Sequence, residues 1–205
     1  MGRYARIALW LALITQIAWM AGQWVSGDGP GDRSFYDAVI IAAFVGLALA
    51  HGRVRWLNAG LRILVGLTFL GSVADRFGLL GAAGAAGVSW GDFDHFIAYT
   101  RSVNAFLPAS WASTLAVVAT IGESILGAML IIGLRTRLAA VGAALLLLVF
   151  GSAMVVSLGI GAQFDYAVAV LAAGSWFLAT VDSNALAVGS WRWRRISRPV
   201  ASVRR

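Results

Sequence analysis

The sequence predicts an all-α, polytopic membrane protein: a bundle of six transmembrane helices with one further helix at the membrane interface. Hydrophobic residues make up 60% of the 205 residues and charged residues only 12%, whereas soluble domains carry roughly a quarter charged residues. The few charges leave six apolar stretches, most of them near the roughly 20 residues that a helix needs to cross a bilayer. A chain this poor in charge could not cover its own surface in water.

The six expected spans are separated by more polar segments, and the longest of these, between the third and fourth spans, contains the interfacial helix. The first has no charged residue, the third contains Arg62, the fourth contains Glu123, and the sixth has Asp165 near its start. All three prolines lie outside the spans, as unkinked helices require. The spans are residues 7–27, about 35–51, 56 to about 74, 109–134, 138 to about 160, and about 162–181.

The first span has an alternative interpretation as a signal peptide, because Arg3 and Arg6 precede an apolar run. No convincing small-residue cleavage site follows that run. We therefore expect a retained helix.

Arginine placement predicts the orientation. With the N-terminus in the cytoplasm, thirteen of sixteen arginines fall on the inner side and seven of nine acids on the outer side, as the positive-inside rule requires. Both termini are then cytoplasmic. The absence of lysine and the 24 glycines suggest a GC-rich bacterium, and hence its cytoplasmic membrane. The basic tail, residues 184–205, should contact anionic lipid headgroups rather than nucleic acid.

Residues 92–107 should form the interfacial helix on the outer side. Their apolar side chains fall mostly on one helical face, which suits a helix lying flat on the membrane. Ser89 or Asp92 could cap its start, and Pro108 ends the connection.

Several chemistries are disfavoured by composition. The chain has no Cys, which excludes a catalytic thiol and iron–sulfur clusters. Its two histidines, His51 and His95, fall at opposite membrane surfaces, so a bis-His haem is not expected. No clustered metal ligands and no dinucleotide-binding fingerprint are present, so no metal site is predicted.

Glu123 is the sharpest candidate for chemistry. A carboxylate near mid-membrane costs roughly 2.5–3.5 kcal/mol on insertion scales. Ala112, Ala116, Ala119 and Gly127 share its helical face, which predicts a close helix contact and a side chain pointing into the bundle. Glu123 is either a catalytic carboxylate that accepts a proton or binds quinone, or a structural carboxylate tied to a cation. Helical rise places Arg62 within reach, so an Arg62–Glu123 ion pair is predicted.

A second candidate is a polar cluster at the outer mouth of the bundle. Its members lie at the outer ends of two spans and on the interfacial helix: Asp75, Arg76, His95, Asp165 and Tyr166. The cluster could serve a small oxidisable substrate or proton release. Ordinary interfacial solvation and aromatic anchoring are the favoured explanation of these residues.

Four segments carry a resemblance to a known family. They are LRILVGLTFLGSVADRFGL (61–79), GDFDHFIAYTRSVNAFLPAS (91–110), ATIGESILGAMLIIGLRTRLAAVGAALLLLVFGSAM (119–154) and QFDYAVAVLAAGSW (163–176). This pattern resembles the DoxX family of bacterial membrane proteins. The resemblance implies a four-helix membrane unit at residues 56–183, with two additional helices in residues 1–55. Some relatives, the DoxD-type subunits, belong to thiosulfate:quinone oxidoreductases, so the cofactor implied is a quinone, not covalently bound.

Three functions follow as hypotheses. The first is a quinone-linked subunit of a membrane oxidoreductase. The second is a non-catalytic accessory subunit of a larger assembly, with protein partners or further copies of itself in the bilayer. The third is a small-solute transporter, which few intramembrane charges and unbroken helices disfavour. Whether the chain is itself an enzyme is not decided by its sequence.

Overall fold

The computed structural model describes residues 2–26 and 34–188, and helices are the regular structure of these ranges. The α-helices are α1 (Gly2–Ser26), α2 (Ser34–Leu49), α3 (Arg55–Arg76), α4 (Phe93–Val103), α5 (Ala112–Ile132), α6 (Thr136–Leu158) and α7 (Val168–Leu178). Two short 3-10 helices, η1 (Ala109–Trp111) and η2 (Ile160–Gln163), precede α5 and α7. The all-helical prediction is confirmed for the described residues.

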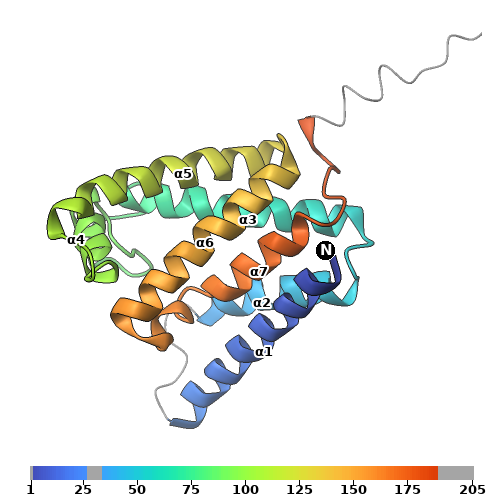
Figure 1. The fold of residues 1–205 in the computed structure, drawn as a ribbon, viewed down its shortest axis with the longest axis horizontal. Helices are drawn as coiled ribbons and strands as arrows, with labels where there is room; N and C mark the ends of the chain where they lie inside the picture. Colours follow the sequence, from blue (N-terminus) through green and yellow to red (C-terminus); the bar gives the residue numbers. More distant parts are fainter. Residues whose placement is uncertain (1, 27–33, 189–205) are drawn as a thin grey trace, which may run out of the picture.

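The long helices run alternately up and down, whereas α4 lies across one end of the bundle (Figure 1). At the opposite end, the segment that follows α7 contacts three others: the start of α1, the α2–α3 turn and the α5–α6 turn. Asn58 there donates to the carbonyl oxygens of Gly52 at 2.8 Å and Asp182 at 2.9 Å. We call these the α4 end and the arginine end. The arginine end comprises residues 2–6, 50–58, 133–137 and 179–188, and includes Arg3, Arg6, Arg53, Arg55, Arg135 and Arg137.

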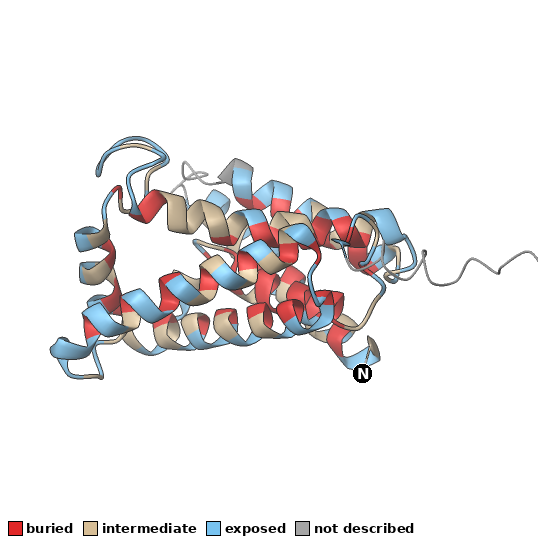
Figure 2. Ribbon diagram, turned by 90° about the horizontal axis from the view of Figure 1, so that it is seen from above, coloured by how far each residue is buried: buried red, intermediate tan, exposed pale blue. Residues whose placement is uncertain are grey.

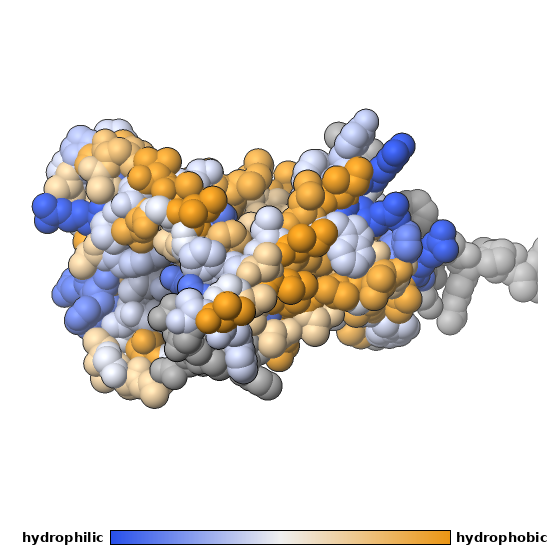
Figure 3. All heavy atoms as spheres, turned by 90° about the horizontal axis from the view of Figure 1, so that it is seen from below, coloured by the Kyte–Doolittle hydropathy of each residue, from blue (hydrophilic) through white to orange (hydrophobic). Residues whose placement is uncertain are grey.

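Four helical segments are long and apolar enough to cross a membrane: α1, α3, residues Ala109–Ile132 and α6. Their outward faces carry exposed aliphatic side chains, such as Leu145 and Val149. Exposed residues lie mainly on the outside of the bundle, and apolar side chains form a band between more hydrophilic ends (Figures 2 and 3). The protein is therefore a multi-pass membrane protein in contact with lipid. The count of six spans stays a prediction, because α2 and α7 are apolar but shorter.

The sixth expected span differs most from its prediction. Residues 162–181 are not one helix: η2 and a turn occupy residues 160–167, Ala167 has a left-handed φ of 48°, and α7 has 11 residues. Eleven residues rise only about 16 Å. The interruption is stabilised from α1, where the buried amide of Gln16 donates to the Phe164 carbonyl oxygen at 2.9 Å. The expectation of unbroken helices, which disfavoured a transporter, is therefore not met at the sixth span. The scarcity of charges within the membrane still disfavours a transporter.

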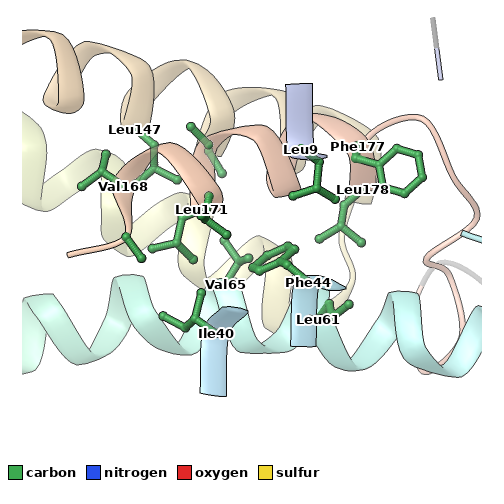
Figure 4. Close-up of a cluster of buried hydrophobic side chains, with 14 of the residues drawn as sticks. Leu9, Ile40, Phe44, Leu61, Val65, Leu147, Val168, Leu171, Phe177 and Leu178 are labelled. Atoms are coloured by element: carbon green, nitrogen blue, oxygen red, sulfur yellow. The ribbon is translucent and has the colours of Figure 1, made fainter. Parts of the chain in front are cut away.

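The main core surrounds α7 and includes the two N-terminal helices. Figure 4 shows Leu9 of α1, Phe44 of α2, Val65 of α3 and Leu171 of α7 in this cluster. Gly174 lies directly against the Phe44 ring, since a Cβ there would be 2.1 Å from a ring carbon. Helices α1 and α2 thus pack as part of the bundle and do not stand apart from the DoxX-like segment.

Helices α3 and α5 pack closely through small residues. The predicted stripe of α5 is buried: Ala112, Ala116, Ala119, Glu123 and Gly127 all face inward. A Cβ added to Gly66 of α3 would lie 2.8 Å from the Gly127 carbonyl oxygen, so the two backbones leave no room for a side chain. The stripe prediction is confirmed, and this contact determines which residues of α3 and α5 face each other.

The predicted interfacial helix is present as α4. Asp92 is its N-cap and accepts from the His95 backbone N–H at 2.8 Å. The helix ends at Val103, before the predicted residue 107, because the chain turns at Asn104 ahead of Pro108. Phe96, Thr100 and Val103 face the bundle, while Asp94 and Arg101 are exposed.

A buried ion pair at the α4 end

Glu123 is buried in an ion pair with Arg76, the last residue of α3. Arg76 Nη2 lies 2.7 Å from Glu123 Oε1 and 2.8 Å from Oε2. Both residues are 2% exposed. Two charge-assisted hydrogen bonds offset much of the cost of burying the charges. The prediction that Glu123 points into the bundle is confirmed.

Polar neighbours on α3 and α5 complete the environment of Arg76. Its Nη1 donates to Thr120 Oγ1 at 2.9 Å, and its Nη2 also contacts Ser72 Oγ at 3.0 Å. Thr120 lies three residues before Glu123, and Ser72 four residues before Arg76, so each shares a helical face with the charge it supports. Among the described atoms, the buried Nε of Arg76 has no hydrogen-bond partner.

Aromatic rings cover the guanidinium group. Arg76 Cζ lies 3.6 Å from the centre of the Phe96 ring, which comes from α4, and 5.3 Å from the Trp90 ring in the preceding loop. These cation–π contacts are strongest where water is excluded. Trp90 in turn contacts Phe96 edge-on and lies 5.7 Å from the Tyr99 ring.

Asp75, the neighbour of Arg76, fixes the loop that supplies Trp90. Its buried carboxylate accepts backbone N–H groups from Ser89 at 2.8 Å, Trp90 at 3.3 Å and Gly91 at 3.2 Å. The adjacent Asp75 and Arg76 thus connect α3 to the loop and to α5, respectively. This arrangement ties α3, α5, α4 and the loop into one unit at the α4 end.

The predicted partner of Glu123 was wrong. Arg62 is fully buried, but its guanidinium group donates to main-chain carbonyl oxygens: those of Leu130 and Ile131 in the last turn of α5, and those of Ser183 and Ala185 after α7. The last carbonyl groups of a helix lack partners within it, so Arg62 serves as a cap for α5. The Leu130 and Ile131 carbonyl groups lie two helical turns, about 11 Å, beyond Glu123 along α5. The Arg62 guanidinium group is therefore held away from the Glu123 carboxylate.

The predicted outer polar cluster forms only in part. Asp75 and Arg76 are buried side by side, as described. His95 is exposed and pairs with Asp92 at 2.8 Å, and Asp165 is exposed. Tyr166 is half-buried, with its ring centre 6.5 Å from that of Tyr99. The hydrogen bonds from the His95 backbone N–H and ring lower the pKa of Asp92.

Sequence reasoning missed four contributors to the ion pair: Ser72, Trp90, Phe96 and Thr120. The helical spacing of Ser72 and Thr120 from the charged residues was a usable signal. The role of Trp90 depends on a loop conformation that no periodicity encodes.

Both members of the pair are enclosed, since each is only 2% exposed. The two best-formed hollows of the described residues are lined by other side chains. The larger, about 320 Å³, lies at the arginine end. Within residues 2–26 and 34–188, no group of three or more His, Asp or Glu side chains could hold a metal ion. The Arg76–Glu123 pair therefore has the geometry of a structural link between α3 and α5.

The fold and the site thus define a multi-pass helical membrane protein whose α3 and α5 are joined by a buried ion pair. Comparison with family models identifies one domain of this protein. Residues 57–158, from α3 to the end of α6, match the DoxX model, so this part of the chain is a DoxX domain. The resemblance inferred from the sequence is confirmed. Neither the curated proteins nor the solved structures contain a match.

Proposed function

We propose that this protein is a non-catalytic membrane subunit that supports a quinone-linked oxidoreductase assembly in the bacterial cytoplasmic membrane, with both termini and the arginine end in the cytoplasm. The observation that carries the accessory role is the enclosed Arg76–Glu123 pair. Both carboxylate oxygens of Glu123 are engaged by one guanidinium nitrogen, and aromatic rings cover the cation. A group held in this way stabilises helix packing and is badly placed to exchange protons with a substrate.

The link to quinone chemistry comes from the DoxX resemblance, and the chain has no cysteine to hold a redox cluster. A quinone carbonyl would need a donor such as the unpartnered Arg76 Nε, and its ring would need a flat neighbour such as Trp90. Arg76 and Glu123 are each only 2% exposed, and the rings of Phe96 and Trp90 cover the guanidinium group. These residues therefore leave no open site for a quinone, and we assign quinone binding to a partner protein.

Deletion and complementation in the source bacterium test the accessory role. Removing the chain should lower the membrane abundance and quinone-reductase activity of a protein that co-purifies with it in mild detergent. Complementation with the wild type should restore both. A double variant that keeps the helices packed, Arg76→Met with Glu123→Leu, should also restore both, because no titrating group is required.

Direct quinone binding by this chain is the second candidate, favoured by the unpartnered Arg76 Nε beside Trp90. It predicts that the chain, purified without partners, carries close to one quinone per protein. It also predicts that the double variant folds but fails to complement. Observing both results would replace the accessory role.

A further inference from the structure

The larger of the two hollows lies at the arginine end, where α1 and α6 begin and α7 ends. It measures about 320 Å³ and is lined by Gly2 at the start of α1, Thr136 and Arg137 at the start of α6, and Thr180 and Asn184 after α7. This volume is within the range of small-molecule sites, about 300–1,000 Å³. The described side chains lining it include no carboxylate.

The charged side chain among the described residues lining this hollow is that of Arg137. Arg137 is exposed and, within the described part of the chain, has no carboxylate partner. The nearby Asp182 is paired with Arg55 at 2.8 Å. An anion entering the hollow would therefore meet a guanidinium group whose planar fork matches two phosphate oxygens.

Hydrogen-bond donors in the hollow add to this preference. The Thr136 hydroxyl donates to Asn184 Oδ1 at 2.9 Å, which orients the Asn184 amide and leaves its N–H groups as the available donors. Gly2 and Thr136 also begin helices, whose first N–H groups lack intrahelical partners and favour anions. Arg137, Asn184 and the two helix starts thus all offer positive ends to one space.

Apolar surface next to the hollow distinguishes a lipid from a soluble anion. Leu138 follows Arg137 on α6 and is 61% exposed, and Ile7 of α1 is 46% exposed. Both helices continue from the hollow as apolar membrane spans. Acyl chains could lie along these faces while the headgroup occupies the hollow.

We propose that this hollow binds the phosphodiester headgroup of an anionic phospholipid, with Arg137 and Asn184 as its principal donors. Basic pockets between membrane helices are a recurrent means of holding such headgroups. The site is independent of the Arg76–Glu123 pair and of the accessory function proposed above, so each can fail without the other.

The experiment uses full-length protein in detergent, with phosphatidylglycerol as the probe, phosphatidylcholine as the neutral control and native mass spectrometry to count bound lipid. Loss of one charged hydrogen bond should weaken phosphatidylglycerol binding about tenfold in Arg137→Gln. Arg135→Gln is the matched control, because Arg135 is exposed two residues away and does not line the hollow. It should retain wild-type binding.

Asn184→Asp supplies a second variant. It keeps the oxygen that accepts from Thr136 but replaces the N–H donors with negative charge, so binding should fall at least as far as in Arg137→Gln. Unchanged thermal unfolding without added lipid would show that these variants are folded.

Two outcomes would overturn the proposal. Equal losses in Arg137→Gln and Arg135→Gln would show diffuse attraction to an arginine-rich surface and no defined site. Displacement of phosphatidylglycerol by millimolar inorganic phosphate, with phosphate alone raising the unfolding temperature as much as the lipid does, would identify a soluble phosphate as the ligand.

Discussion

Replacement of Glu123 by Gln is the most direct test of the buried ion pair. Gln has nearly the same shape, so packing is kept, but the variant leaves the Arg76 cation without a counter-ion at a position only 2% exposed. Hydrogen bonds to Thr120 and Ser72 and the contact with Phe96 remain. The perturbation therefore isolates the charge of Glu123.

The expected cost can be worked from this geometry. One hydrogen bond between Arg76 and the new amide oxygen can survive, whereas the second, charge-assisted bond is lost, which removes about 1.5–3 kcal/mol. Breaking a buried pair by removing one partner costs about 3–5 kcal/mol in soluble proteins. Because the polar and aromatic neighbours still stabilise the cation, we expect about 3 kcal/mol. At 2–4 °C per kcal/mol for a chain of this size, the unfolding temperature should fall by about 6–12 °C.

Thermal unfolding followed by tryptophan fluorescence in a mild detergent measures this change. Asp165→Asn is the matched control, since it neutralises an exposed carboxylate, and it should shift the midpoint by no more than about 1 °C. The double variant Arg76→Met with Glu123→Leu should recover most of the loss, because apolar replacements of a buried pair are often neutral or stabilising. A Glu123→Gln protein as stable as the wild type would refute the structural role, and so would a double variant less stable than the single one.

Three other predictions concern the supports of the site. Gly66→Ala should lower the unfolding temperature because its Cβ would stand 2.8 Å from a carbonyl oxygen, whereas Gly60→Ala, with nothing within 4 Å, should be neutral or slightly stabilising. Asp75→Asn should speed hydrogen exchange of the amides at residues 89–91, measured by mass spectrometry, because the charged acceptor is lost. The pKa of Asp92 is lowered, so its cap on α4 stabilises the folded state at pH values above the ordinary pKa of an Asp. This stabilisation is lost as the pH falls through the lowered pKa of Asp92. NMR titration of the Asp92 carboxyl carbon should therefore give a midpoint below the ordinary pKa of an Asp, and an ordinary midpoint would contradict the cap.

Elements that are specified by local sequence were predicted well, whereas elements that depend on contacts between distant residues were not. Helices α3, α5 and α6 match the expected apolar stretches closely because length and hydropathy are local properties. The inward face of α5 also followed from local spacing, through Ala116, Ala119 and Gly127. The interruption before α7 did not, because it depends on a left-handed Ala167 and on Gln16, nearly 150 positions away in the chain.

The partner of Glu123 was missed for a related reason. Arg76 lies at the end of α3 and was placed outside the hydrocarbon region, whereas Arg62 fell inside it. Which arginine reaches Glu123 depends on how α3 and α5 are offset along their axes. That offset is determined by the approach of Gly66 to Gly127, a contact between segments that hydropathy treats separately.

The two ends of the bundle differ in how their cations are compensated, and this separates their roles. At the α4 end, Arg76 is neutralised internally by Glu123 and covered by Phe96 and Trp90, so this arginine offers no free charge to an anion. At the arginine end, Arg137 lines an open hollow and has no carboxylate partner among the described residues. The α4 end has one exposed arginine, Arg101, but also the exposed carboxylates of Asp92, Asp94 and Asp165, so long-range attraction of anions should act mainly on the arginine end. Loss of the Arg76–Glu123 pair should change folding but not lipid binding, whereas loss of Arg137 should change lipid binding but not folding.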